Sequence, residues 1–323
     1  MDSTLKRAEY TWPVHVFHEK VKELDLAIVI ARASPRKKFV HDLRTAARSV
    51  EAQLTLISFL GRLPAHEDEA DEVRKRLKKV RRASSVVRDL DVQRNLIQED
   101  ISVGLMDKSM RHDAKRLRHE LNKQRRQQAL GLVQVLCEEG PRLMLSLLLL
   151  EEKLAPAMMC IVDTKQMTTL IGRWFFHDDK RSPSNFGAGR QTGNLTKIVR
   201  SVGLLKKRSL HDLRKAAKLG RYMVDGLLTE SSAAKTLADQ FEAIHQAGGL
   251  WHDRLLLAEI AAKREGNDAR LTRQYVKREC VMLTEYRAHL VDVLGGPDAR
   301  FQRKRGSLTP RRVATKASSR FCV

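Results

Sequence analysis

HDLRTAAR at residues 41–48 returns 170 positions later as HDLRKAAK at residues 211–218. Six of the eight residues are identical, and the last position is basic in both copies. Such close internal similarity indicates that the chain is built from two copies of one unit. Each octapeptide places a histidine and two cations at i, i+3 and i+7, which is one face of a helix. The repeat therefore predicts two equivalent helices, each with a short basic face.

Helical spacing of apolar residues extends through the rest of the chain. Proline and glycine are scarce, with 8 and 17 residues, and alternation typical of strands is almost absent. We therefore predict an all-α protein. The expected helices cover residues 14–31, 36–60, 67–99 with a candidate break at Ser84-Ser85, 109–138, 141–159, 206–228, 233–262 and 267–294.

A polar stretch rich in glycine and serine separates the two halves of the sequence. It lies at residues 177–195 and reads as a loop. We predict an N-terminal extension at residues 1–14 and a helical domain at 15–300, with bundles at about 15–176 and 196–300. Residues 301–323 carry seven Lys and Arg and no Asp or Glu, which predicts a disordered basic tail.

The charge of the chain points to a polyanionic partner. Its 61 Lys and Arg against 39 Asp and Glu give a formal net charge of +22 at pH 7. The tail supplies only seven of these cations, so most of the excess belongs to the helical part. Nucleic acid, an anionic membrane and a non-nucleic polyphosphate are the partners that this composition favours.

The cysteines and the N-terminus favour a cytoplasmic protein. Cys137, Cys160, Cys280 and Cys322 are far apart and form no Cys-x-x-Cys pair, which argues against a zinc site or a disulfide framework. The N-terminus has no cationic segment followed by an apolar one, so we expect no secretory signal. The apolar run at 143–150 is too short to insert into a membrane.

Two further predicted helices carry basic stripes. Arg74, Lys78, Arg81 and Arg88 share one face of the third helix, and Arg111, Lys115, Arg118 and Arg125 share one face of the fourth. Like charges at i, i+4 destabilise a helix unless an anion binds there. A single stripe is more often a solvated face, but several stripes on a chain of this charge favour an anion site.

The histidines and aspartates leave more than one role open. His41 and His211 lack metal-ligand spacing, and either bond phosphate or pack between helices. Asp89, Asp91 and Asp253 lie next to arginines in the sequence. They could hold a catalytic metal, although fixing the geometry of those arginines is the favoured role. Phosphate-binding glycine loops and the nucleophile elbow of hydrolases are absent from the sequence.

Together these residues resemble the CHAD family, the conserved-histidine α-helical domain. The resemblance rests on His41-x-x-Arg44-x-x-x-Arg48, on Arg88-Asp-Leu-Asp-Val92, on the basic helix that follows, and on His211-x-x-Arg214-x-x-x-Lys218-x-x-Arg221-Tyr222. It covers about residues 15 to 295. It implies two antiparallel helical bundles related by a pseudo-twofold axis, with a basic groove or channel between them. It also implies binding of inorganic polyphosphate, often at polyphosphate granules, with no firmly assigned catalysis.

The chain departs from the family pattern at a few positions. After the first histidine motif the family often has Arg-Arg-x-Arg, whereas this chain has Arg48-Ser49-Val50-Glu51. Leu219-Gly220 replaces a more basic pair, and His252-Asp253 stands where Asn-Asp is common. These changes predict a weaker contribution from positions 49 and 51.

The leading hypothesis is therefore non-enzymatic binding of inorganic polyphosphate, in the cytoplasm and at polyphosphate granules, without a metal or a cofactor. The runner-up is a basic helical protein that binds nucleic acid non-specifically, and the third is a phosphoanhydride hydrolase with metal at Asp89, Asp91 and Asp253. The predicted polyphosphate-binding residues are His41, Arg44, Arg48, Lys78, Arg81, Arg88, Arg111, Lys115, Arg118, His211, Arg214, Lys218, Arg221, Arg273 and Lys277.

Overall fold

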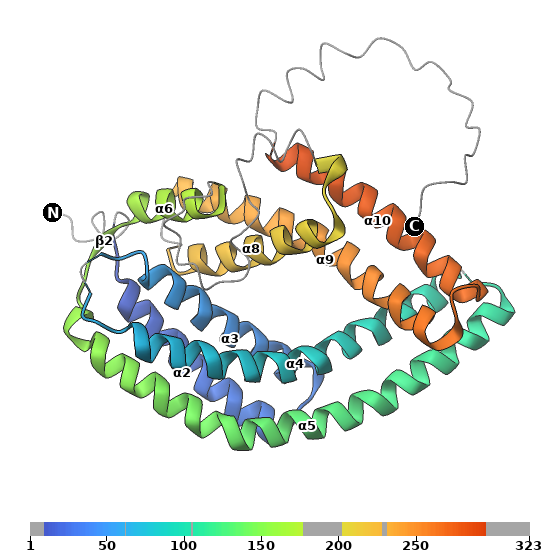
Figure 1. Ribbon diagram of the computed structural model, residues 1–323, viewed down its shortest axis with the longest axis horizontal. Helices are drawn as coiled ribbons and strands as arrows, with labels where there is room; N and C mark the ends of the chain where they lie inside the picture. Colours follow the sequence, from blue (N-terminus) through green and yellow to red (C-terminus); the bar gives the residue numbers. More distant parts are fainter. Residues whose placement is uncertain (1–9, 62, 105, 177–201, 228–230, 295–323) are drawn as a thin grey trace, which may run out of the picture.

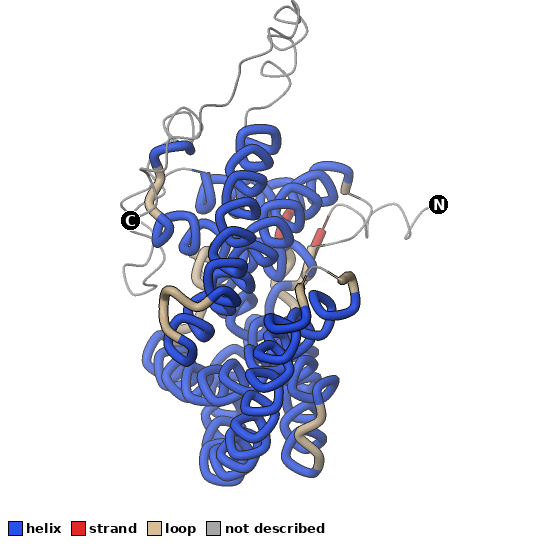
Figure 2. Tube along the Cα trace, turned by 90° about the vertical axis from the view of Figure 1, so that its right-hand side faces the viewer, coloured by secondary structure: helices blue, strands red, loops and turns tan. Residues whose placement is uncertain are grey.

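A computed structural model describes residues 10–61, 63–104, 106–176, 202–227 and 231–294 of the chain. These residues are almost entirely helical, as Figure 2 shows, and the all-α prediction is confirmed. The predicted extension up to residue 9, the joining loop at 177–195 and the basic tail at 301–323 lie outside the described residues, so those assignments stay predictions.

The elements follow one another in two similar series. The first contains β1 (Tyr10–Thr11), α2 (Pro13–Ala33), α3 (Lys37–Ile57), α4 (Glu67–Ser102) and α5 (Lys108–Leu154). The second contains η1 (Ala155–Ala157), β2 (Val162–Asp163), α6 (Thr164–Phe176), η2 (Val202–Leu204), α8 (Lys207–Asp225), α9 (Ser232–Glu265) and α10 (Arg270–Leu294). β1 pairs antiparallel with β2, with Tyr10 opposite Asp163. The two octapeptides fall on α3 and α8, as the repeat predicts.

Each series builds a core of its own. Leu43, Val50 and Leu54 of α3 pack with apolar residues of α2, α4 and α5. In the second series, Phe241 and Trp251 of α9 pack with residues of α6, α8 and α10. This second core also includes Ala52 and Leu56 of α3, so the two bundles are joined along α3 and α8, which lie side by side near the middle of Figure 1.

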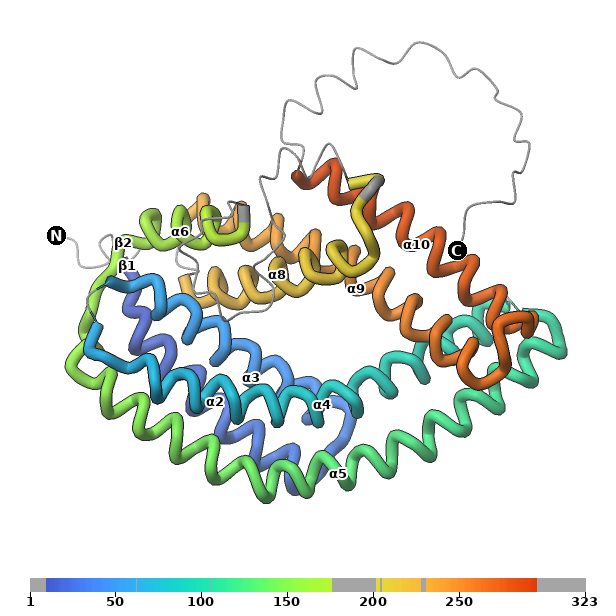
Figure 3. Tube along the Cα trace, viewed as in Figure 1, coloured from blue at the N-terminus to red at the C-terminus, as the bar shows by residue number. Residues whose placement is uncertain are grey.

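The bundles meet again at the far ends of their long helices. Leu90 and Ile97 of α4 share a third cluster with Leu117 of α5, Leu257 of α9 and Tyr275 of α10. Next to this cluster, the buried carboxylate of Asp100 on α4 pairs with Arg254 of α9 (Oδ2 to Nη1, 2.6 Å) and with Arg278 of α10. Figure 3 shows the resulting frame, in which α4 and α5 run along one side and reach α9 and α10 at one end.

Two expected breaks in the helices are not present. The segment predicted at 109–138 and most of the one predicted at 141–159 form the single helix α5, with Pro141 inside it, and the second segment ends early, at Leu154. The apolar row Leu132, Leu136, Leu143 and Leu147 continues past the proline and is buried against the first bundle, so packing maintains the helix where the proline removes one hydrogen bond. At the other expected break, the Ser84 hydroxyl donates to the Arg81 carbonyl within an uninterrupted α4.

α6 and the two short strands were not expected from the sequence. Met167, Ile171 and Phe175 recur every four residues on α6 and are fully or almost fully buried in the second core. The pattern is helical but covers only three turns, which is little signal for a sequence-based assignment. α6 stands in the second series where α2 stands in the first.

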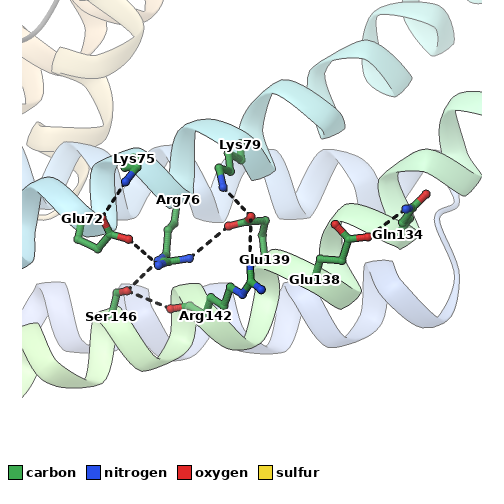
Figure 4. A network of polar contacts seen from close by, with 9 residues as sticks. All are labelled: Glu72, Lys75, Arg76, Lys79, Gln134, Glu138, Glu139, Arg142 and Ser146. Atoms are coloured by element: carbon green, nitrogen blue, oxygen red, sulfur yellow. Dashed lines mark hydrogen bonds and ion pairs between the residues drawn. The ribbon is translucent and has the colours of Figure 1, made fainter.

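The seam between α4 and α5 uses part of the basic excess internally. Arg76 and Lys79 of α4 both contact the carboxylate of Glu139 on α5, and Lys79 Nζ lies 2.6 Å from Glu139 Oε1 (Figure 4). Arg76 Nε also donates to the Ser146 hydroxyl at 3.1 Å. Glu139 neutralises part of the charge of these two cations. A positive net charge therefore does not mean that every Lys and Arg is available to bind an anion.

Adjacent glycines of α9 provide a test of the packing between α8, α9 and α10. A Cβ on Gly248 would lie 2.8 Å from the Tyr286 ring and 3.0 Å from Arg214 Cγ, whereas a Cβ on Gly249 would meet nothing within 4 Å. We expect Gly248→Ala to lower the free energy of unfolding by about 1–3 kcal/mol through overpacking. Gly249→Ala should raise the free energy of unfolding by about 0.5–1 kcal/mol, because alanine has a higher helix propensity than glycine. Chemical denaturation measures both, and equal effects would contradict the packing described.

Candidate functional site

A cleft of about 600 Å³ lies where α3 and α4 of the first bundle face α8 and α9 of the second. Six cations, four histidines and two aspartates line it, along with a few small or apolar residues. These groups are Arg44, Arg48, Arg88, Arg214, Lys215, Lys218, His41, His211, His245, His252, Asp89 and Asp253. The residues of the lining, all in the described part of the chain, include no Phe, Tyr or Trp.

The octapeptides explain why α3 and α8 bring their cations to this place. Their paired alanines, Ala46-Ala47 and Ala216-Ala217, are buried in the cores of their own bundles, and Ala52 and Leu56 further along α3 pack in the second core with α8. The polar positions of the same turns then face the cleft from both sides. Helical periodicity therefore places Arg44 and Arg214 opposite each other once the bundles join.

Two aspartates hold the central arginines. Arg44 Nη1 lies 3.5 Å from Asp89 Oδ1, and Asp253 is the carboxylate that interacts most strongly with Arg214. Burial raises the pKa of both carboxyl groups, while Arg44 and Arg214 act against that rise. Burial also lowers the pKa of both arginines. The four side chains thus form an alternating group of charges at the centre of the cleft, with further cations around it.

The surrounding cations are not fully neutralised. Burial, followed by the charges of Arg44 and Arg48, lowers the pKa of Lys218 to about 7. Burial and then Arg48 and Arg44 lower the pKa of Arg81, at the edge of the cleft, to about 9. Burial contributes most to these shifts and the neighbouring cations add to them, and an anion in the cleft would raise these pKa values again.

A carboxylate occupies each end of this row of cations. Arg48 Nη1 lies 3.0 Å from Glu51 Oε2, and Arg81 pairs with the same oxygen. Arg221 occupies in the second octapeptide helix the position that Glu51 has in the first, ten residues after the histidine. Its Nη1 lies 2.7 Å from Glu242 Oε2, and its guanidinium lies over the Tyr222 ring at 4.6 Å. Glu51 therefore stands in place of a cation of the family pattern, and its carboxylate also pairs with Arg48 and Arg81.

The histidines of the cleft are neutral near pH 7. Burial, and then neighbouring cations, lower the pKa of His211 and His245 to about 4 and that of His252 to about 3. The rings of His211 and His252 lie 4.3 Å apart between centroids. The Nδ1 atoms of these two rings are buried without a hydrogen-bond partner, so they are polar groups that a ligand could satisfy.

The structure brings together part of the predicted set. Seven predicted residues line the cleft: His41, Arg44, Arg48, Arg88, His211, Arg214 and Lys218. Arg81 and Arg221 flank it through their ion pairs with Glu51 and Glu242. The other six predicted residues are not among those that line it.

Those six residues lie on other surfaces. Lys78 of α4 and Arg111 and Lys115 of α5 are exposed, and Arg118 is half-buried near Arg94. Arg273 and Lys277 line a separate hollow on α10, which is partly apolar. The stripes separate because α5 packs on α4 and α2, whereas α4 contacts α9 along only part of its length. A role for these six in anion binding stays a prediction.

Several residues of the cleft were not predicted. Lys215 lies one turn after His211, and His245 lies two turns before His252, so both could have been found by extending the helical face. Asp91 does not join Asp89 and Asp253, because it is buried against Arg94 and Arg125 in another part of the fold. The described residues contain no group of three or more His, Cys, Asp or Glu placed to hold a metal ion.

Comparisons with known proteins agree with this architecture. The model of the CHAD domain matches residues 17–262. The chain belongs to the CHAD family. The crystal structure of the CHAD domain from the plant Ricinus communis superposes with a TM-score of 0.58 at 16% identity, over 88% of this chain and 92% of that one. PptA from Streptomyces chartreusis superposes with a TM-score of 0.50 at 14% identity, over 91% and 98%.

At such low identities these likenesses establish the fold of the CHAD domain and no more. No curated protein matches the sequence significantly. None of the described helices is long and apolar enough to cross a membrane.

Proposed function

We propose that this CHAD protein binds inorganic polyphosphate in the cleft between α3, α4, α8 and α9, without catalysing a reaction. The convergence of six cations from both halves on one cleft is the observation that carries the proposal. Polyphosphate repeats a negative charge at every phosphate, and arginine can bond two phosphate oxygens at once. The resemblance to the family supports the same ligand, and with it a place at polyphosphate granules.

The lining of the cleft favours polyphosphate over nucleic acid. Proteins that bind single strands commonly stack bases on aromatic side chains. Here the large aromatic residues Trp251, Tyr286 and Phe241 are buried in the second core, and none faces the cleft. What remains is a set of charged groups suited to phosphates alone.

The polar groups of the cleft fit binding better than hydrolysis. Asp89 and Asp253 interact with Arg44 and Arg214, so their charges are engaged in orienting cations. Asp91 does not line the cleft, and its carboxylate is paired with Arg125. We therefore expect no phosphate release when the protein is incubated with polyphosphate and Mg²⁺ or Mn²⁺, and release at enzymatic rates would contradict the proposal.

The central arginines provide the main test. We expect Arg44→Ala combined with Arg214→Ala to weaken binding of long-chain polyphosphate on the order of a hundredfold, because each charged hydrogen bond contributes about 1.5–3 kcal/mol. The dependence of log affinity on log salt should become less steep by about 1.5, since two phosphate contacts are lost. Calorimetric titration at several salt concentrations measures both quantities.

The matched control is Arg142→Ala combined with Arg270→Ala, which removes the same charge from exposed positions outside the cleft. An equal loss in both double variants would mean that only net charge matters. Competition by duplex DNA and by RNA at equal phosphate concentration should be weak, and effective displacement would favour the nucleic-acid alternative.

Lys218 makes binding depend on pH. Its pKa is about 7 in the free protein and rises when an anion binds, so affinity should be greatest below pH 7 and decline as the pH rises through that value. Lys218→Arg keeps the charge at every pH and should remove this component. Chain-end phosphates titrate in the same range, so the difference between wild type and variant isolates Lys218. Identical pH profiles would contradict the assignment.

Glu51 should limit affinity. Glu51→Gln keeps the shape of the side chain but releases Arg48 and Arg81 from their carboxylate, so we expect polyphosphate to bind about three- to tenfold more tightly. The same variant should be less stable by about 1 kcal/mol, because two half-buried cations lose their partner. Glu120→Gln, which removes a carboxylate from an ion pair on α5 outside the cleft, is the control of equal charge. Equal gains in affinity from both variants would show that Glu51 has no local effect.

A further inference from the structure

A second basic hollow, of about 320 Å³, lies beside the start of α3. It is lined by Arg36 and Lys37 of that end, by Asp91 and Arg94 of α4, and by Asn122, Arg125 and Arg126 of α5. Five of these seven residues are cations and one is an acid, so the hollow keeps a strong positive charge. We call it the Asp91 hollow.

The Asp91 hollow has a rigid base. Asp91 is 2% exposed, and its carboxylate receives bonds from Arg94 Nη1 at 3.1 Å and from Arg125 Nε at 3.2 Å. Arg125 Nη2 also donates to the Pro35 carbonyl at 2.6 Å, which ties α5 to the segment before α3. One carboxylate thus fixes two arginines and neutralises only one of their charges.

The remaining potential is positive. Burial lowers the pKa of Arg94, Asp91 opposes that shift, and Arg118 and Arg125 add to it. Arg94 Nε is buried without a hydrogen-bond partner. Arg36, Lys37 and Arg126 are exposed, and within the described part of the chain none of them forms an ion pair. The positive end of the α3 dipole lies at the same place, where no side chain caps the helix.

The hollow and the central cleft are lined by neighbouring residues of α3 and α4, although Asp89 and Asp91 lie on different sides of α4. Lys37 in the hollow and His41 in the cleft are four residues apart on α3, which is one helical turn or about 6 Å along its axis. On α4, Arg88 and Asp89 line the cleft, and Asp91 and Arg94 line the hollow within the next turn. Lys37 is therefore the next cation on the α3 face for a flexible polyanion that leaves the cleft past His41, and Arg94 and Arg126 line the hollow with it.

We propose that the Asp91 hollow is a second phosphate-binding site, which takes the part of a long polyphosphate chain that extends beyond the central cleft. This inference rests on the proposed function of the cleft. It predicts that the length of the chain decides which sites contribute. A chain of three phosphates is held by the cleft alone, whereas a long chain contacts the cleft and the hollow together and gains affinity from both.

The test uses two double variants of the full chain with the same loss of charge. Lys37→Ala with Arg126→Ala removes two exposed cations of the hollow, and Lys38→Ala with Lys123→Ala removes two exposed cations next to them on α3 and α5 that do not line it. Because all four side chains are exposed, both proteins should fold normally, which circular dichroism and thermal unfolding check. Tripolyphosphate and long-chain polyphosphate serve as the two probes in calorimetric titrations.

We expect the hollow variant to bind the long chain about tenfold more weakly, with a salt slope less steep by about 1.5. It should bind tripolyphosphate within about twofold of wild type. The control variant should stay near wild type with both probes. Equal affinity of the hollow and control variants for the long chain would overturn the second site, and so would an equal loss with both probes.

The central variant separates this inference from the proposed function. If Arg44→Ala with Arg214→Ala loses binding of both probes while the hollow variant matches its control, the cleft stands and the second site fails. If the central variant binds both probes normally, the proposed function fails. If, in that case, only the hollow variant loses polyphosphate binding, the proposed path from the cleft to the hollow is also overturned.

Discussion

The fold brings like charges together at its centre, and the group formed by Arg44, Arg214, Asp89 and Asp253 makes this possible. Two helices that each carry a basic face would repel one another if nothing stood between those faces. Ala52 and Leu56 of α3 belong to the second core and hold α3 in contact with α8. The two aspartates, supplied by α4 and α9, offset part of the repulsion. The bundles on either side therefore serve to hold a cleft that is unfavourable by itself.

Much of this arrangement can be predicted from the sequence, because helical periodicity depends only on residues that are close together in the chain. The octapeptides alone place Arg44 with Arg48 and Arg214 with Lys218, and their recurrence indicates that two such faces exist. Asp89 and Asp253 also stand out, since each follows a basic or histidine residue near the middle of a long helix. The family resemblance then supplies what periodicity cannot, namely that the two halves face each other.

The rest depends on contacts between distant segments. Nothing near Pro141 in the sequence shows that α5 continues, because the reason is a leucine row packed on the first bundle. The stripes of α4 and α5 look alike as sequence, yet Glu139 neutralises Arg76 and Lys79 while Asp91 organises Arg94 and Arg125. The effect of Glu51 was only half visible. The sequence shows that Glu51 replaces a cation of the family pattern, but it does not show that Glu51 pairs with Arg81 on α4.

The second meeting point of the bundles, around Asp100, Arg254 and Arg278, has a consequence for the cleft. Asp100 lies near the end of α4, whereas Arg254 of α9 directly follows the cleft residue Asp253, so this ion pair holds the two walls of the cleft against spreading. Ordering long arginine and lysine side chains costs conformational entropy, and here much of that cost is incurred when the chain folds. The proposed polyphosphate ligand thus meets a surface that is already arranged for it, and the ion pairs of Asp100 favour binding together with the cations of the cleft.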